Sequence, residues 1–183
     1  RKHGVGGGIG AGGGGNGGSG GPNYTIAQQR TIALLHLCAT EDEPDICKLR
    51  ALLEGGADVH TMVANGPYTM TLLMWALFRG HTETAKAILE ADPSIEHVRM
   101  TNNEGETALI CASLQVNVDS VKAILEADPS IEHVRMANIN GMNALMCASH
   151  VGNTDSVKAI LEVDPSIEHV RMASNSGMTA LMC

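Results

Sequence analysis

Aromatic residues are scarce in this sequence: Phe, Trp and Tyr together make up 2% of its 183 residues. Hydrophobic residues still account for 44%, so a core must be filled mainly by Leu, Ile, Val, Ala and Met. This composition disfavours a core built around large rings. It favours thin, stacked layers of helices that pack through aliphatic side chains.

Basic residues are also few, with 12 Lys and Arg against 20 Asp and Glu and a net charge of −8. Arg1 and Lys2 are the only charged residues before residue 30, which leaves 10 basic and 20 acidic residues in the remainder. A nucleic-acid-binding protein needs a basic patch or stripe, so the charge argues against that class. An acidic surface favours solubility, and the alternative is attraction to a basic protein partner.

Long hydrophobic runs are missing as well. The longest, Met70–Phe78, is far shorter than the ~20 residues that span a bilayer. No secretory signal is visible, and we expect an intracellular, cytoplasmic protein without a membrane segment. Because the chain begins at Arg1 and stops at Cys183 inside a repeat, we also expect a fragment of a longer protein.

The sequence lacks the motifs that accompany catalysis: G-x-S-x-G, H-E-x-x-H and G-K-[ST] do not occur. Gly8–Gly13 matches G-x-G-x-x-G, but no strand precedes it and no βαβ pattern follows, so the match is attributed to chance. His36 and Cys38 lie two residues apart on a predicted helix and therefore do not face each other. We predict no enzyme activity, no catalytic residue and no cofactor.

What the sequence does contain is a repeat. Asp119–Asn138 recurs almost letter for letter at Asp155–Ser174, and Ala85–Met100 is a third copy of its core. The period of 36 residues is marked by Asp92, Asp128 and Asp164, by Gly105, Gly141 and Gly177, and by Cys111, Cys147 and Cys183. A fixed period in this range predicts an array of stacked units rather than a globule with a catalytic cleft.

Each unit is predicted to form a turn, two short helices and a return loop. Thr71–Ala76 and Thr107–Ala112 open the first helix of two units. Asn117 and Asn153 are predicted to cap the second helices. The following Asp-Pro pairs are predicted to end these helices, because proline cannot continue a helix.

These openings resemble the ankyrin motif T-P-L-H-x-A, with Thr, Leu and Ala in place and Pro and His replaced. Arg79–Glu90 is similar to the rest of an ankyrin unit, and Leu52–Val59 to its usual ending. The resemblance covers about residues 25–183 and implies an all-α, ankyrin-like solenoid of helix-turn-helix repeats. Ankyrin units usually run ~33 residues, so the longer period predicts extended return loops.

The domain boundaries follow from this pattern. Glycine fills 13 of the 18 positions at 4–21, which predicts a disordered tail over residues 1–22. A divergent first unit would cap the stack with a polar outer face. We predict this capping repeat at 23–64, repeats at 65–101, 102–137 and 138–173, and a truncated repeat at 174–183.

The recurring histidines and cysteines raise the question of a metal site or of disulfide bonds. Neighbouring units should lie ~8–10 Å apart, which is too far for equivalent histidines to share a zinc ion at ~2.0–2.1 Å or for equivalent cysteines to bond. A disulfide bond between Cys38 and Cys47 is not excluded by this spacing argument. We predict no metal site and five free, buried thiols, as in a reducing compartment.

The resemblance implies protein–protein recognition on a concave surface of loop tips and first helices. We predict a monomeric, non-catalytic scaffold that binds another protein, with a regulatory or targeting segment of a larger enzyme, or a structural spacer, as alternatives. Recurring polar residues of the return loop are predicted to be exposed and to bind the partner: Glu96, His97, Arg99, Glu132, His133, Arg135, Glu168, His169 and Arg171. The competing interpretation is that Glu and Arg pair within each loop and need no partner.

Overall fold

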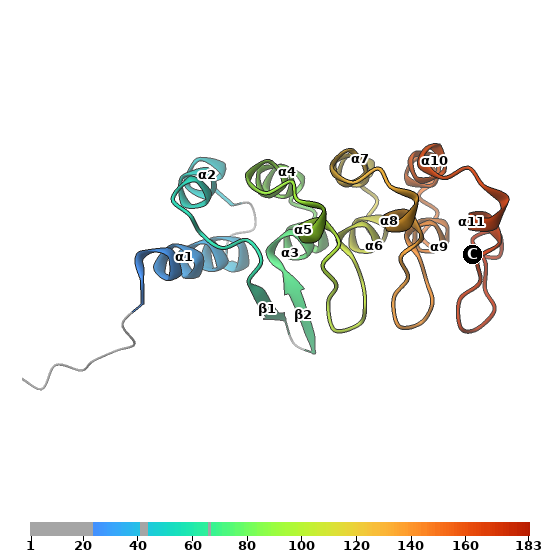
Figure 1. The fold of residues 1–183 in the computed structure, drawn as a ribbon, viewed down its shortest axis with the longest axis horizontal. Helices are drawn as coiled ribbons and strands as arrows, with labels where there is room; N and C mark the ends of the chain where they lie inside the picture. The colour runs from blue at the N-terminus through green and yellow to red at the C-terminus, as the bar shows by residue number, and fades with distance from the viewer. Residues whose placement is uncertain (1–23, 41–43, 66) are drawn as a thin grey trace, which may run out of the picture.

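The computed structural model describes residues 24–40, 44–65 and 67–183, so the predicted tail at 1–22 lies outside the described part. Within it the helices form two stacked rows, and hairpins project beyond the inner row (Figure 1). The inner row consists of α1 (Ile26–Thr40), α3 (Leu72–Phe78), α6 (Ala108–Ser113) and α9 (Ala144–His150). The outer row consists of α2 (Ile46–Glu54), α4 (Thr82–Ala91), α7 (Val118–Ala127) and α10 (Thr154–Val163).

Side-chain caps set the starts of the inner helices. Thr71 Oγ1 accepts a hydrogen bond from the backbone N–H of Met74 at 3.2 Å, and Thr107 caps α6 in the same way. Asn143 takes this role in α9. All six residues of α6 are buried, so the inner row forms the centre of the core. The prediction that Thr71 and Thr107 open the first helices is confirmed.

The outer helices bury one face each. In α7, Val121 and Ile124 are fully buried, while Leu125 is 6% exposed. Asn117 and Asn153 cap α7 and α10 as predicted. Helices α4, α7 and α10 each end at the residue before an Asp-Pro pair, which confirms the predicted stop.

The return loops are not wholly irregular, because each contains a further helical turn: α5 (Ile95–Val98), α8 (Ile131–Arg135) and α11 (Ile167–Arg171). Asp128 Oδ1 accepts the N–H of Ser130 at 3.2 Å, and Ser130 Oγ accepts the N–H of His133 at 3.3 Å. This serine cap recurs in the other two loops. The predicted extended return loop thus contains a short helix that was not predicted, because Asp-Pro-Ser both ends one helix and caps the next.

A second departure from the prediction is a small amount of β structure. Strands β1 (Met62–Asn65) and β2 (Tyr68–Thr71) form an antiparallel hairpin, where only the turn that begins a unit was predicted. Its pair Met62↔Thr71 has counterparts in the isolated bridges Thr101↔Thr107, Ala137↔Asn143 and Ala173↔Thr179. The fold is otherwise the predicted helical solenoid.

One continuous hydrophobic core runs through the stack, from Leu34 in α1 to Ile160 in α10. Helix α7 packs against α4, α6 and α10, so each unit is covered by its neighbours. In α1, Gln28, Gln29 and Arg30 are exposed, and so are the apolar Ile26 and Ile32. Among the described helices, none combines the length and the apolar character needed to cross a membrane.

Candidate functional site

A groove lies between the hairpins and the inner helices in the C-terminal half of the stack. Its cavity volume is about 360 Å³. Leu114 and His150 line it from the ends of α6 and α9, and Asn138, Met142 and Met178 line it from the hairpin side. The groove is therefore built from several repeats at once, which suits an elongated ligand better than a small molecule.

Side chains at the ends of α3, α6 and α9 continue this surface along the stack. Phe78, Leu114 and His150 are 36 residues apart and are all exposed, Phe78 to 49% and Leu114 to 38%. Two of these three side chains, Phe78 and Leu114, are apolar and occupy equivalent positions in neighbouring repeats, so they form a row with His150 instead of scattering over the surface. Such rows are typical of binding surfaces.

The N-terminal end of this row carries an aromatic cluster. Trp75 stacks on Phe78 with ring centroids 6.3 Å apart, and the Arg79 guanidinium lies 6.0 Å from the centre of the Trp75 ring. The indole N–H of Trp75 donates to the carbonyl of Cys38 at 3.1 Å, which fixes the ring between α1 and α3. Trp75 and Phe78 are the single Trp and the single Phe of the chain. Trp and Arg are enriched among the residues that dominate binding energy.

The predicted exposure of the three return-loop histidines is wrong. His97, His133 and His169 are each 1% exposed. The Nδ1 of His133 lies 3.2 Å from the backbone carbonyl of Asp128, and the other two rings repeat this contact. Burial lowers the pKa of His133, which favours the neutral ring. These histidines hold the return loop against the core, so a partner cannot reach them.

Two of the three predicted arginines are used between repeats. Arg99 Nε donates to Asp128 Oδ2 at 2.5 Å, and Arg135 Nε donates to Asp164 Oδ2 at 2.6 Å. Burial opposes ionisation of Asp128 and is the largest single influence on its pKa, but the hydrogen bonds from Arg99 and Ser130 together outweigh it and lower the pKa of Asp128 to about 2. Arg135 likewise lowers the pKa of Asp164 to about 2. These arginines clamp one repeat to the next.

The predicted acidic residues keep their exposure. Glu96, Glu132 and Glu168 are exposed, and so is Arg171. Glu168 Oε2 lies 3.6 Å from Arg135 Nη1, so this pair joins two repeats and does not close one loop on itself. Of the nine predicted residues, the structure thus brings the histidines and two arginines into the framework and leaves the glutamates on the surface.

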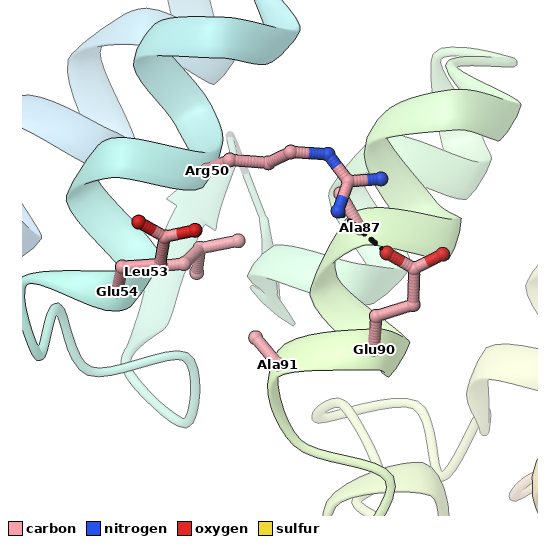
Figure 2. A pocket seen from close by; sticks show the side chains of 6 residues that line it. All are labelled: Arg50, Leu53, Glu54, Ala87, Glu90 and Ala91. Carbon is pink, nitrogen blue, oxygen red and sulfur yellow. Dashed lines mark hydrogen bonds and ion pairs between the residues drawn. The ribbon is translucent and has the colours of Figure 1, made fainter.

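A second hollow lies on the outer side, between α2 and α4, with a volume of about 300 Å³ (Figure 2). Arg50 and Glu90 face each other across it, with Arg50 Nη1 2.6 Å from Glu90 Oε2 (Figure 2). Both side chains are about half exposed, so the pair contributes ~0–1 kcal/mol. The remaining lining residues offer no nucleophile paired with a base. We therefore interpret this hollow as the boundary between two neighbouring repeats and not as a catalytic site.

All five cysteines lie in the described part of the chain, and none of them forms a disulfide there. Cys38 and Cys47, whose pairing the sequence had not excluded, are therefore not bonded in this structure. Cys38, Cys111 and Cys147 are buried as predicted, whereas Cys47 is exposed and Cys183 is partly exposed. Burial raises the pKa of Cys111 and Cys147 to about 12. These two thiols are therefore poor nucleophiles.

Comparison with known families agrees with this architecture. A model described as "Ankyrin repeats (3 copies)" matches residues 35–135, and one described as "Ankyrin repeat" matches residues 140–169. No curated protein matches the chain. Ankyrin repeats are generally protein–protein interaction modules. Since the two matches together cover well over half of the sequence, the chain belongs to the ankyrin repeat family.

Proposed function

We propose that this chain is a non-catalytic scaffold that binds another protein along the groove between its hairpins and inner helices. The observation that carries the proposal is the repeated row of exposed side chains, Phe78, Leu114 and His150. Leu114 and His150 line the same groove as the hairpin residues. Several repeats therefore contribute equivalent positions to one surface, as an extended protein segment requires.

The chemistry of the surface indicates the kind of partner. Exposed apolar side chains in the row favour a segment with its own apolar residues. Glu106 also lines the groove, and the chain carries a net charge of −8. A partly apolar, basic segment of another protein fits both features, because charge complementarity speeds association and excludes acidic competitors.

The other interpretations concern the setting of this surface. A regulatory or targeting segment of a larger enzyme would bind through the same groove, and the full-length gene would distinguish it. A passive spacer needs no exposed apolar row, so Phe78 and Leu114 argue against that role.

Selection of binders from a displayed peptide library, followed by measurement of Kd, tests the groove. Leu114→Arg places a long charged side chain at a position that is 38% exposed, so the fold should tolerate it. We expect a loss of at least tenfold in affinity for the selected peptides. A matched control changes Glu132 and Glu168 to Ala on the return loops and should leave the affinity unchanged.

The control also tests the remaining prediction from the sequence, that the exposed return-loop glutamates bind the partner. A loss of binding in the glutamate variant, with Leu114→Arg unaffected, would overturn the groove and place the partner on the return loops. Equal melting temperatures for all variants would show that the differences arise from binding and not from unfolding.

A further inference from the structure

The junctions between repeats share one contact, and the first junction makes it with a different residue. Asp128 and Asp164 each receive an arginine from the preceding repeat. At the first junction the corresponding aspartate is Asp92, and His60 contacts it, with Nε2 2.9 Å from Oδ2. A histidine thus stands where the later junctions have Arg99 and Arg135.

The hairpin register supports this correspondence. Met62 pairs with Thr71, and Thr101 pairs with Thr107, which is 36 residues after Thr71. His60 and Arg99 each lie two residues before the first of these pairs. Each also follows a buried valine, Val59 or Val98. The two side chains therefore leave the backbone at equivalent places and reach equivalent aspartates.

The consequence at the first junction is a cluster of two histidines and a carboxylate. His97 Nδ1 lies 3.8 Å from Asp92 Oδ2, and the rings of His60 and His97 meet edge to face with centroids 5.0 Å apart. One candidate ligand atom from each of the three side chains lies within 4.8 Å of the other two. The Nε2 of His97 is buried and has no hydrogen-bond partner in the described part.

We infer that His60, Asp92 and His97 bind a divalent transition-metal ion, with Zn²⁺ as the best match. Zinc accepts imidazole nitrogen and carboxylate oxygen at ~2.0–2.2 Å and keeps a fourth position for water when three protein ligands are present. The cluster needs only a modest contraction to reach that geometry. The His60 side chain is 47% exposed and that of Asp92 is 24% exposed, so both can adjust and the ion has a route in.

The contact of His97 with the backbone favours this role. Its Nδ1 lies 3.1 Å from the backbone carbonyl of Asp92. When Nδ1–H donates to that carbonyl, Nε2 keeps its lone pair for a metal, and a carbonyl behind the ring is a common orienting partner of metal-bound histidine. Because Nδ1 is the nitrogen that lies 3.8 Å from Asp92 Oδ2, metal binding through Nε2 also requires the side chains of His60 and Asp92 to move toward Nε2. His133 and His169 share this arrangement, so they supply the same half of a site at the later junctions.

At the later junctions, an arginine prevents metal binding. A guanidinium stays positively charged and has no lone pair to offer a metal. The carboxylates of Asp128 and Asp164 lie 3.5 Å from His133 and His169, as Asp92 lies near His97. Arg99 and Arg135 already pair with these carboxylates, at the place where His60 contacts Asp92. The described part of the chain therefore holds one such site. The two later junctions serve as natural comparisons, because they differ from it in having arginine in place of His60.

Calorimetric titration with ZnCl₂ of the tag-free chain in a Cys47→Ser background tests the site, because Cys47 is an exposed thiol. We expect one equivalent to bind and the melting temperature to rise. His60→Arg should abolish both effects while keeping the fold, since arginine already fills this position at the later junctions. His60→Gln provides a second variant and should weaken binding at least tenfold.

The reciprocal change is Arg99→His, which should add a second equivalent of bound zinc at Asp128 and His133. The inference is overturned if the parent chain binds no zinc, or if His60→Arg still binds one equivalent with the same affinity. A folded Arg99→His variant that binds only one equivalent would contradict the assignment of arginine as the residue that closes the later junctions. Melting curves recorded without metal establish that each variant is folded.

Discussion

Arg99 and Asp128 lie 29 residues apart and belong to different repeats, yet they form a 2.5 Å hydrogen-bonded ion pair. The carboxylate of Asp128 is 1% exposed and the Arg99 side chain is 32% exposed. The same guanidinium also donates to Ser130 Oγ at 2.6 Å. One arginine therefore satisfies both a buried charge and the serine cap of α8.

Removing Arg99 should destabilise the stack. Arg99→Ala leaves Asp128 buried without its cation, and breaking buried pairs costs ~3–5 kcal/mol. Because Arg99 is partly exposed, we expect about 2 kcal/mol, measured as a lower free energy of unfolding in urea. Lys158→Ala breaks only the exposed pair with Asp155 and is the control, with an expected change below ~0.5 kcal/mol. Equal effects of the two variants would contradict the clamp.

Acid should weaken the same clamps. The pKa values of Asp128 and Asp164 are lowered from 3.8 to about 2 in the folded chain. Lowered carboxyl pKa values stabilise the fold at every pH above the unfolded value, and this stabilisation is lost as the pH falls from about 4 to about 2. Each aspartate should account for ~2 kcal/mol of that loss.

Urea unfolding of the parent chain and of Asp128→Asn between neutral pH and pH 2 measures this contribution. The variant should be less stable than the parent chain at neutral pH. The gap should close on acidification, because the amide that replaces the carboxyl group does not titrate. A gap that stays constant down to pH 2 would show that the ion pair contributes nothing to the pH dependence.

Local patterns in the sequence predicted the helical part of the fold well. The caps at Thr71, Thr107, Asn117 and Asn153 act within three residues of their partners, so short-range chemistry decides them. The Asp-Pro stops are local for the same reason. The helical turns in the return loops were missed, although the serine after each Asp-Pro pair is an ordinary helix cap.

The candidate surfaces were harder to predict, because they depend on contacts between repeats. The identical amino-acid sequences of the three return loops suggested an exposed row of Glu, His and Arg side chains. Whether His133 is buried depends on how its loop lies against the core, and whether Arg99 is available depends on an aspartate in the next repeat. Neither relationship is visible within one unit. The correspondence of His60 with Arg99 also became visible only through the hairpin register.

Cooperation between neighbouring repeats should appear when a core leucine of a middle unit is shortened. Leu125→Ala removes a side chain that is 6% exposed in α7, which packs against α4 and α10. We expect a cost of ~2–5 kcal/mol. Hydrogen exchange should show lost protection in α4 and α10 as well as in α7. Lost protection confined to 121–126 would contradict nearest-neighbour coupling.

Two glycines in the left-handed region separate backbone strain from contact between repeats. Gly141 has φ +74° and Gly152 has φ +71°, so alanine carries a similar conformational cost of ~1–2 kcal/mol at either position. A Cβ at Gly141 would lie 2.9 Å from the backbone N of Asn175 in the next hairpin, whereas a Cβ at Gly152 meets nothing within 4 Å. Neighbouring hairpins are joined there by the hydrogen bond from Asn175 N to the carbonyl of Asn140 at 2.9 Å. Gly141→Ala should therefore cost ~1–3 kcal/mol more than Gly152→Ala in urea unfolding, because overpacking forces the two hairpins apart. If the two variants lose the same stability, the hairpins yield to the added methyl group and their contact does not hold the repeats in register.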